Sequence, residues 1–297
     1  MEPTSTTVAL GGQEIGWHVW HADDAKTTTA PLLVIFHGFL AHARYPTVRY
    51  AAEILVGHLP GATVVAADMP GHGISKGLRG YLPCGADELI HFGHAVLAKA
   101  RELYDNHNKK RPIFLVGSSM GGTIAWNIAL KEPAGVIAGV VLLAPMMKLN
   151  VSTLEQGALS ALALLVPTWQ VIPSSSTNSE KQYRDEKKRK ECDNDQLTIS
   201  GSKIRVGSAY TCVQLAQTAT QIDDEQQLTK FPVWMGVADQ DVVVDKAGSL
   251  QLHERITTAG GASTLAVYPA LHGLLCEPSP LYDQIAGDLL AWVKEKI

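Results

Sequence analysis

Short apolar runs that alternate with helical segments constrain this sequence most strongly. Residues 31–36 read PLLVIF, a continuous apolar run that is typical of a strand covered on both faces. Similar runs span residues 63–67, 113–116, 140–143, 233–237 and 264–267, and helical patterns span residues 48–58, 87–105, 120–131, 246–258 and 281–294. This alternation predicts an α/β fold, in which a mostly parallel central sheet is flanked by helices.

Two segments depart from the alternation. Residues 8–20 alternate around a Gly-Gly pair, which predicts an antiparallel hairpin at one edge of the sheet. Residues 146–228 contain no run that reads as a strand of this sheet, and we call them the cap segment. We expect the cap segment to be a mainly helical insertion over the carboxyl ends of the strands, where such sheets bind ligands. The predicted core comprises residues 1–145 and 229–297.

The composition excludes several classes of function. Of the 297 residues, 46% are hydrophobic and 18% are charged, so the chain can bury a full core and is not disordered. Its formal net charge of −4 lacks the basic footprint that nucleic-acid binding needs. Four scattered cysteines form no CxxC pair, which argues against a disulfide scaffold or a structural zinc site. We therefore expect no nucleic-acid partner, no metal and no organic cofactor.

The sequence predicts a cytoplasmic protein that contacts membranes only peripherally. Residues 1–7 have neither the basic nor the apolar stretch of a secretion signal. The longest apolar stretch, Ala158–Val166, is about half as long as a bilayer span. Residues 152–170 are rich in leucine and include Trp169, so we expect reversible membrane association through this part of the cap segment. The basic run 187–190 is expected to add attraction to anionic lipid.

The most informative stretch, residues 113–122, reads IFLVGSSMGG. An apolar run leads directly into its GxSxG motif and a helical pattern follows, which is the context of a nucleophile elbow. Register selects Ser119, because a motif centred on Ser118 would need glycines where Val116 and Met120 stand. The turn strains the backbone of its central residue, and only small flanking residues avoid a clash. We expect Ser119 to be a catalytic nucleophile.

Two further residues complete a catalytic triad in the sequence. A serine hydroxyl needs a base, and the base needs a carboxylate that orients it. Asp239 directly follows the apolar run 233–237 and is the preferred acid, with Asp241 as its rival. His272 is the predicted base, because of the eleven histidines it alone follows both the serine and the acid in a loop after a strand.

The tetrahedral intermediate of such chemistry needs two hydrogen-bond donors for its oxyanion. One predicted donor is the backbone N–H of Met120, directly after the nucleophile at the start of a helix. The other is the backbone N–H of Phe39, in the turn that follows the apolar run 31–36. We interpret His37 as a structural residue that packs beneath this turn.

Six stretches occur in an order and at a spacing that identify a family. They are HGFLAH (37–42), DMPGHGIS (68–75), GSSMGG (117–122), LAPM (143–146), AD (238–239) and YPALH (268–272). Together they resemble the monoacylglycerol lipase and lysophospholipase family of α/β-hydrolases over about residues 30–295, with plant-type features at 77–81 and 165–169. The resemblance implies the α/β-hydrolase fold, an acyl tunnel beneath the cap segment, and Ser119, Asp239 and His272 as the triad.

Two positions depart from the pattern of animal monoacylglycerol lipases. Ala41 stands before His42, where those enzymes have Glu. When Asp195 is aligned with the aspartate of their cap, Cys192 stands where they have Tyr. The resemblance places both positions near the polar end of the family's pocket, which holds glycerol, so the preference for the alcohol half of the ester stays open.

We expect a serine ester hydrolase that cleaves monoacylglycerol to fatty acid and glycerol through an acyl-enzyme. A lysophospholipase and a soluble carboxylesterase, similar to caffeoylshikimate esterase, are the alternatives. A non-catalytic α/β-hydrolase that only binds a ligand is a third alternative, but a binding module has no need of a strained serine within an intact triad. Labelling of Ser119 by a fluorophosphonate distinguishes the enzyme from the binding module.

Overall fold

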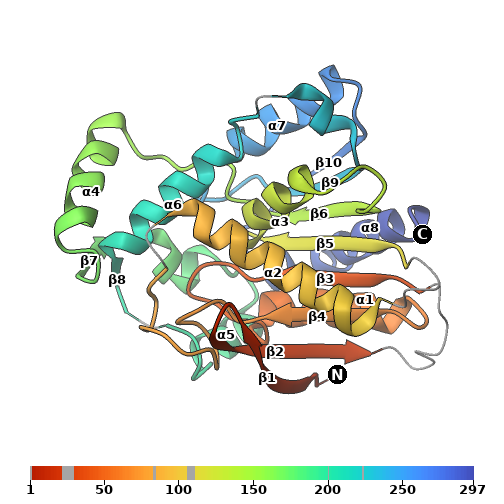
Figure 1. Ribbon diagram of the computed structural model, residues 1–297, viewed down its shortest axis with the longest axis horizontal. Helices are drawn as coiled ribbons and strands as arrows, with labels where there is room; N and C mark the ends of the chain where they lie inside the picture. Colours follow the sequence, from red (N-terminus) through yellow and green to blue (C-terminus); the bar gives the residue numbers. More distant parts are fainter. Residues whose placement is uncertain (1, 22–29, 83–84, 106–110, 200, 223) are drawn as a thin grey trace.

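An eight-stranded sheet runs through the centre of the molecule in the order β1-β2-β4-β3-β5-β6-β9-β10 (Figure 1). The computed structural model describes residues 2–21, 30–82, 85–105, 111–199, 201–222 and 224–297. The strands are β1 (Thr4–Leu10), β2 (Gln13–His21), β3 (Leu32–Phe36), β4 (Thr63–Ala67), β5 (Ile113–Ser118), β6 (Gly139–Leu143), β9 (Val233–Ala238) and β10 (Ser263–Tyr268). The pairs from β4 to β10 are parallel, whereas β1–β2 and β2–β4 are antiparallel.

The central strands are buried on both faces, as their continuous apolar sequences predict. Every residue of β3, β4 and β6 is buried. The edge hairpin is also confirmed, because β1 pairs with β2 in a register that runs from Thr4 opposite Val19 to Leu10 opposite Gln13. The predicted mostly parallel sheet with an antiparallel edge is therefore correct.

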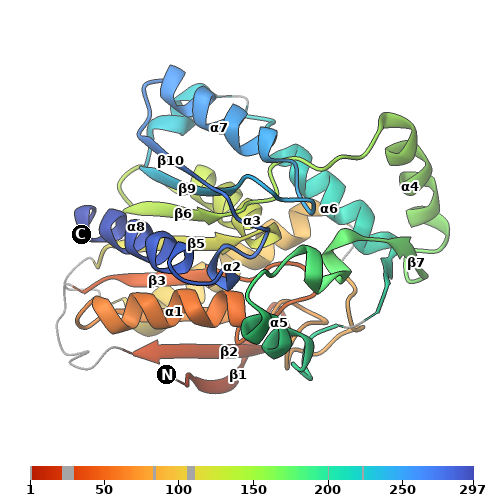
Figure 2. The ribbon, with the colours of Figure 1, turned by 180° about the vertical axis from the view of Figure 1, so that it is seen from behind.

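Helices cover both faces of the sheet and enclose two separate apolar cores (Figures 1 and 2). One face carries α2 (Ala86–Tyr104), α3 (Met120–Lys131) and α7 (Lys246–Thr258), and the other carries α1 (Pro46–His58) and α8 (Leu281–Glu295). Trp126 is fully buried in the first core, and Trp234 is buried in the second. Two filled layers of side chains hold the sheet rigidly, and with it the loops at its carboxyl edge.

The cap segment contributes no strand to the central sheet within its described residues. It contains α4 (Thr153–Leu165), α5 (Glu186–Asp193), α6 (Val206–Thr218), a small antiparallel sheet of β7 (Gln170–Pro173) and β8 (Lys203–Arg205), and the 3-10 turns η1 (Ser175–Thr177), η2 (Ser179–Lys181) and η3 (Glu225–Thr229). Helix α6 contacts α2, α3 and α4, whereas α4 protrudes from one end of the molecule (Figure 1). None of the described helices is long and apolar enough to cross a membrane.

Candidate active site

Ser119 is the only residue between β5 and α3, so the predicted strand–turn–helix is confirmed. Its backbone has φ 54° and ψ −122°, a conformation that a residue with a side chain rarely adopts. The flanking glycines are required by space: a Cβ on Gly117 would lie 2.2 Å from the Gly121 oxygen, and a Cβ on Gly121 would lie 2.0 Å from the Phe36 oxygen. The turn therefore holds the Ser119 side chain at the carboxyl edge of the sheet.

The turn after β3 packs directly against Ser119. A Cβ on Gly38 would lie 3.4 Å from the Ser119 Cβ, and Leu40 has a positive φ of 65°, which bends the chain sharply. Within the described residues, neither the Phe39 N–H nor the Met120 N–H donates to another protein group. Both predicted oxyanion donors are thus free to bind a substrate oxygen.

His37 lies beneath this turn, as the sequence analysis expected, and it is fully buried. Its Nε2 accepts the Met69 N–H at 2.9 Å, so its Nδ1 carries the proton and donates to the Gly38 oxygen at 2.8 Å. Burial lowers the pKa of His37 to about 4. At neutral pH the ring is therefore uncharged, and it ties the oxyanion turn to the loop after β4.

His272 pairs with Asp241, and the preferred assignment of Asp239 as its partner is wrong. The distance from His272 Nδ1 to Asp241 Oδ2 is 2.7 Å, and both side chains are buried. The Asp239 side chain is about half exposed and forms an ion pair with Lys246. The physical reason is that the β9–β10 ladder continues by one bond, from the Asp239 N–H to the Tyr268 oxygen, before the chain turns.

The second oxygen of Asp241 fixes the carboxylate in place. Its Oδ1 accepts the N–H groups of Val243 at 2.7 Å and Val244 at 3.1 Å, which is the pattern of an aspartate that heads a tight turn. Such a turn leaves Oδ2 for the histidine. The sequence alone did not separate the two aspartates, because both stand within three residues of the end of β9.

Ser119, Asp241 and His272 stand in loops at the same edge of the sheet. They do so because the strands that precede them, β5, β9 and β10, run parallel. His272 donates from Nδ1 to Asp241, so its Nε2 keeps a lone pair for a proton. No hydrogen bond joins the Ser119 hydroxyl to the His272 ring in the described part of the chain. In many hydrolases this contact tightens only when a substrate is bound.

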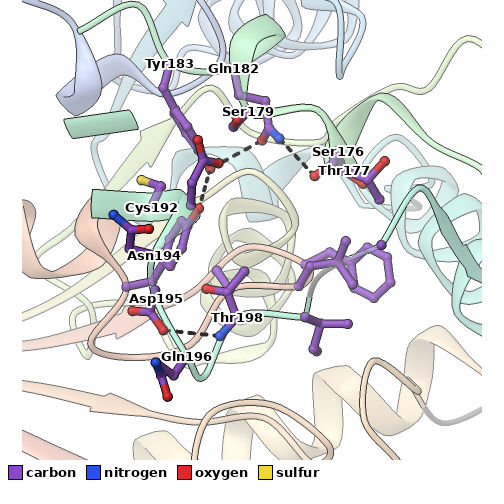
Figure 3. Close-up of a pocket in the computed structure, with 17 residues that line it drawn as sticks. Ser176, Thr177, Ser179, Gln182, Tyr183, Cys192, Asn194, Asp195, Gln196 and Thr198 are labelled. Atoms are coloured by element: carbon purple, nitrogen blue, oxygen red, sulfur yellow. Dashed lines mark hydrogen bonds between the residues drawn. The ribbon is translucent and has the colours of Figure 1, made fainter. Parts of the chain in front are cut away.

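Two cavities adjoin the site, and both are lined by Phe39 and Ser176. The first, which we call the apolar cavity, has a volume of about 620 Å³ and includes Ser119. Its lining is mostly hydrophobic and includes Met146, Leu149, Leu159, Leu162, Ile204 and Val213. The second, which we call the polar cavity, has a volume of about 560 Å³ and is lined mainly by hydroxyl, amide and carboxylate groups (Figure 3).

The two positions that depart from the animal lipase pattern both line the polar cavity. Ala41 and Cys192 lie on its wall together with Asp195. The distance from His42 Nε2 to Asp195 Oδ1 is 3.0 Å, so the core and the cap segment are joined at this point. The family resemblance predicted that these residues lie near one end of a pocket, and in the structure they line the same cavity.

Comparisons with known proteins identify the family of this chain. A family model described as "Serine aminopeptidase, S33" matches residues 27–279. Caffeoylshikimate esterase of Arabidopsis thaliana is 26% identical over 247 residues, which cover 80% of this chain and 70% of that protein. Monoglyceride lipase of Homo sapiens is 26% identical over 303 residues, which cover 97% of this chain and 89% of that protein.

A solved structure shows the same fold. A soluble variant of monoglyceride lipase from Saccharomyces cerevisiae, in complex with a substrate analog, superposes with a TM-score of 0.78 at 17% identity. The superposition covers 100% of this chain and 96% of that one. The predicted α/β-hydrolase fold is confirmed.

Proposed function

The chain belongs to the serine aminopeptidase S33 family of α/β-hydrolases and is a carboxylic ester hydrolase, and from this we propose that it cleaves monoacylglycerols to fatty acid and glycerol. Ser119, His272 and Asp241 form the catalytic triad of this proposal. The observation that carries it is the position of Ser119, which stands in a strained turn and opens onto the apolar cavity. A cavity of this size and lining suits a fatty acyl chain.

Acylation begins at the Ser119 hydroxyl. His272 Nε2 takes the hydroxyl proton while Oγ attacks the ester carbonyl carbon, and the C=O electron pair moves onto the carbonyl oxygen. Asp241 holds the ring in the required tautomer and stabilises the imidazolium that forms, because it accepts the Nδ1–H at 2.7 Å.

The oxyanion binds to two backbone N–H groups. Met120 and Phe39 supply them, and both are free of protein partners within the described residues. Met120 is also the first residue of α3, where the helix dipole favours a negative charge. Removal of one such donor typically costs about 10²–10³ in kcat.

Collapse of the tetrahedral intermediate breaks the bond to the alcohol. His272 returns its proton to the departing alkoxide, and the fatty acid stays on Ser119 as an acyl ester. Water then enters, His272 takes its proton, and a second tetrahedral intermediate releases the fatty acid and restores the serine. His272 thus takes up one proton and returns one proton in each half of the cycle.

The exposed face of α4 supports a second element of the proposal, reversible contact with lipid surfaces. Leu154 and Leu164 are each 85% exposed, Leu165 is 79% exposed and Trp169 is 61% exposed. Within α4 only Leu159 and Ala163 are buried. An apolar patch of this kind on a protruding helix suits an interfacial helix that approaches membrane-dissolved substrates.

The basic run 187–190 lies apart from this patch. Helix α5, which contains it, contacts α1 beside the core, whereas α4 protrudes elsewhere (Figure 2). The Lys188 ammonium donates to the Leu275 and Glu277 oxygens and lies 3.5 Å from the centre of the Tyr282 ring. We therefore propose lipid contact through α4 alone, without an electrostatic contribution from residues 187–190.

An ester of an aromatic acid is the second candidate substrate, because caffeoylshikimate esterase is one of the proteins that this chain resembles. The apolar cavity, with its leucine-rich and methionine-containing wall, favours an alkyl chain over a planar phenol. A panel of monoacylglycerol, lysophosphatidylcholine and caffeoyl shikimate separates the candidates by kcat/KM, and a higher value for either of the last two would overturn the assignment.

A fluorophosphonate probe tests the enzyme itself. We expect the wild-type chain to be labelled and to release fatty acid from monoacylglycerol, and Ser119→Ala to do neither. Ser118→Ala is the matched control, because it removes the adjacent serine of the same motif and is expected to keep both activities. Labelling that survives in Ser119→Ala, or is absent from the wild type, would contradict the proposed nucleophile.

A further inference from the structure

The polar cavity adjoins the loop that contains His272. The Gly273 N–H, directly after His272, donates to the Gln182 oxygen at 2.9 Å, and a Cβ on Gly273 would lie 2.4 Å from the Tyr183 ring. Gln182 and Tyr183 both line the polar cavity. Since His272 must protonate the departing alkoxide, the alcohol half of the ester belongs on this side.

A row of buried neutral groups forms the inner wall of the cavity. The Tyr45 hydroxyl donates to that of Tyr183 at 3.2 Å, and the Tyr183 hydroxyl donates to Gln182 Oε1 at 3.5 Å. Gln182 Nε2 in turn donates to the Ser176 oxygen at 2.9 Å (Figure 3). Burial raises the pKa of both phenols, so they stay protonated. Such a wall offers fixed hydroxyl oxygens and ring faces, which suit the hydroxyls and the flat C–H faces of a polyol ring.

The charges around the cavity disfavour an anionic alcohol. The described lining residues include Asp193 and Asp195 but no Lys, Arg or His. Asp195 Oδ1 already accepts the N–H groups of Leu197 and Thr198 as well as the His42 contact. A phosphate in this cavity would meet carboxylates of its own sign and no cationic partner.

Basic residues do occur beyond the polar cavity, around a much smaller one. Arg79, Lys203 and Arg205 line that space, which adjoins the polar cavity at Leu40 and Ile199. The side chains of both arginines donate to backbone oxygens, Arg79 to Gly73 and Arg205 to Thr168. These guanidinium groups are engaged in holding the cap segment, and the space of about 10 Å³ between them does not admit a phosphate.

The size of the polar cavity exceeds what glycerol needs. Its volume of about 560 Å³ lies in the range of pockets for ligands much larger than a three-carbon alcohol. Ala41 and Cys192 contribute to this space, because each has a shorter side chain than the Glu and Tyr of the animal lipase pattern. Ala41 also removes an acidic side chain from the wall.

We propose that the polar cavity binds the alcohol half of the ester and that the preferred alcohol is an uncharged polyol of sugar size. The inference rests on the proposed function and names its substrate class: monoacyl esters of sugars and of glycosylated glycerol. The reaction is ordinary hydrolysis, in which water supplies the hydroxyl of the fatty acid and the proton of the released polyol.

Three esters with the same lauroyl chain test the proposal: glucose monolaurate, monolauroylglycerol and lauroyl lysophosphatidic acid. We expect kcat/KM to be at least 10-fold higher for the glucose ester than for the glycerol ester, and at least 10-fold lower for the lysophosphatidic acid than for the glycerol ester. A glucose ester that is cleaved no faster than the glycerol ester, or a preference for the phosphate ester, would overturn the proposal.

A charge variant tests the electrostatic part. Gln196 lies at the exposed rim of the polar cavity, and Gln196→Arg is expected to raise kcat/KM for lauroyl lysophosphatidic acid about 10-fold relative to the glucose ester. Gln226→Arg is the matched control, because it makes the same change at an exposed position of η3 outside the cavity, and it should leave the ratio unchanged. Equal ratios in the two variants would show that the phosphate does not enter this cavity.

Hydrolysis of p-nitrophenyl butyrate and fluorophosphonate labelling separate the two levels of failure. A chain that reacts with both probes but shows no preference for the glucose ester contradicts the polyol inference alone. A chain that reacts with neither contradicts the proposed function.

Discussion

Asp239 and Asp241 lie two positions apart in the sequence, and their different partners predict different effects of substitution on kcat. Asp241→Asn should lower kcat by about 10³–10⁴-fold, because an amide no longer holds His272 in the tautomer that leaves Nε2 free. Asp239→Asn should stay near wild type, because it weakens only an exposed ion pair with Lys246. Initial rates on p-nitrophenyl butyrate measure both, and thermal melts check the fold. A large loss in Asp239→Asn alone would return the acid role to that residue.

Among the elements, α4 carries the prediction on lipid contact. Leu164→Glu plus Leu165→Glu should abolish sedimentation with phosphatidylcholine vesicles, because two highly exposed leucines would be replaced by carboxylates. Leu103→Glu plus Leu250→Glu is the matched control, since these leucines are also exposed but lie on α2 and α7. Both variants should retain activity on p-nitrophenyl butyrate.

Equal sedimentation by the α4 variant and the wild type would assign these leucines another role. Loss of sedimentation in both variants would instead point to a general effect of added negative charge. A capping box between Ser152 and Glu155 fixes the start of α4, so the two substitutions near its other end leave that start intact.

The link between η2 and α5 carries a second prediction, on the alignment of the triad. Arg184 donates to the Pro269 oxygen at 3.0 Å and to Gln240 Oε1 at 2.6 Å, so it joins the loops of the base and the acid. It also lies 3.4 Å from the buried Glu277 carboxylate, whose other oxygen accepts the Leu271 N–H at 2.6 Å. The Arg184 guanidinium therefore helps to position the loop residues next to Asp241 and those next to His272.

We expect Arg184→Met to lower kcat about 10-fold with little change in KM, and to slow fluorophosphonate labelling of Ser119 in proportion. Arg184→Lys should recover part of this loss, because an ammonium can reach some of the same oxygens. Arg205→Met is the control, since it also removes bonds to backbone oxygens, those of Thr168 and Arg79, but away from the triad. An equal loss in Arg205→Met would mean that Arg184 supports only general stability.

For the whole molecule, buried histidines set how stability depends on pH. Burial lowers the pKa of His37 to about 4 and that of His72 to about 3, from an ordinary value of 6.5. Below pH 6.5 the unfolded chain binds these protons and the folded chain does not, so the free energy of unfolding falls as the pH falls. Between pH 7.5 and pH 5 each histidine should cost about 2 kcal/mol.

Urea unfolding at these two pH values measures the effect. His72→Gln should reduce the loss of stability on acidification, because the glutamine does not titrate. His58→Gln is the control, since His58 is an exposed residue at the end of α1, and it should leave the pH dependence as in the wild type. The same pH dependence in all three proteins would show that His72 is not a source of acid sensitivity.

The sequence by itself determined the sheet, the turn that holds Ser119 and the loop that holds His272. Strands such as β3 are apolar throughout because both of their faces are covered, so each can be read from the sequence as a short continuous apolar run. The turn at Ser119 depends on residues within two positions of it, and its strain and small neighbours are local properties. The loop position of His272, after the last strand, likewise follows from the order of the elements along the chain.

Only the tertiary structure decided which of Asp241 and Asp239 pairs with His272, and only it gave the sizes and linings of the two cavities. The choice of acid depends on how far β9 stays paired with β10, and one additional bond of that ladder moves Asp239 to the surface. The polar cavity combines Ala41 from the core with Cys192 and Asp195, which lie about 150 residues away in the cap segment. Contacts of this separation leave no period or motif in the sequence, because they arise from how packed elements meet and not from the local preference of any residue.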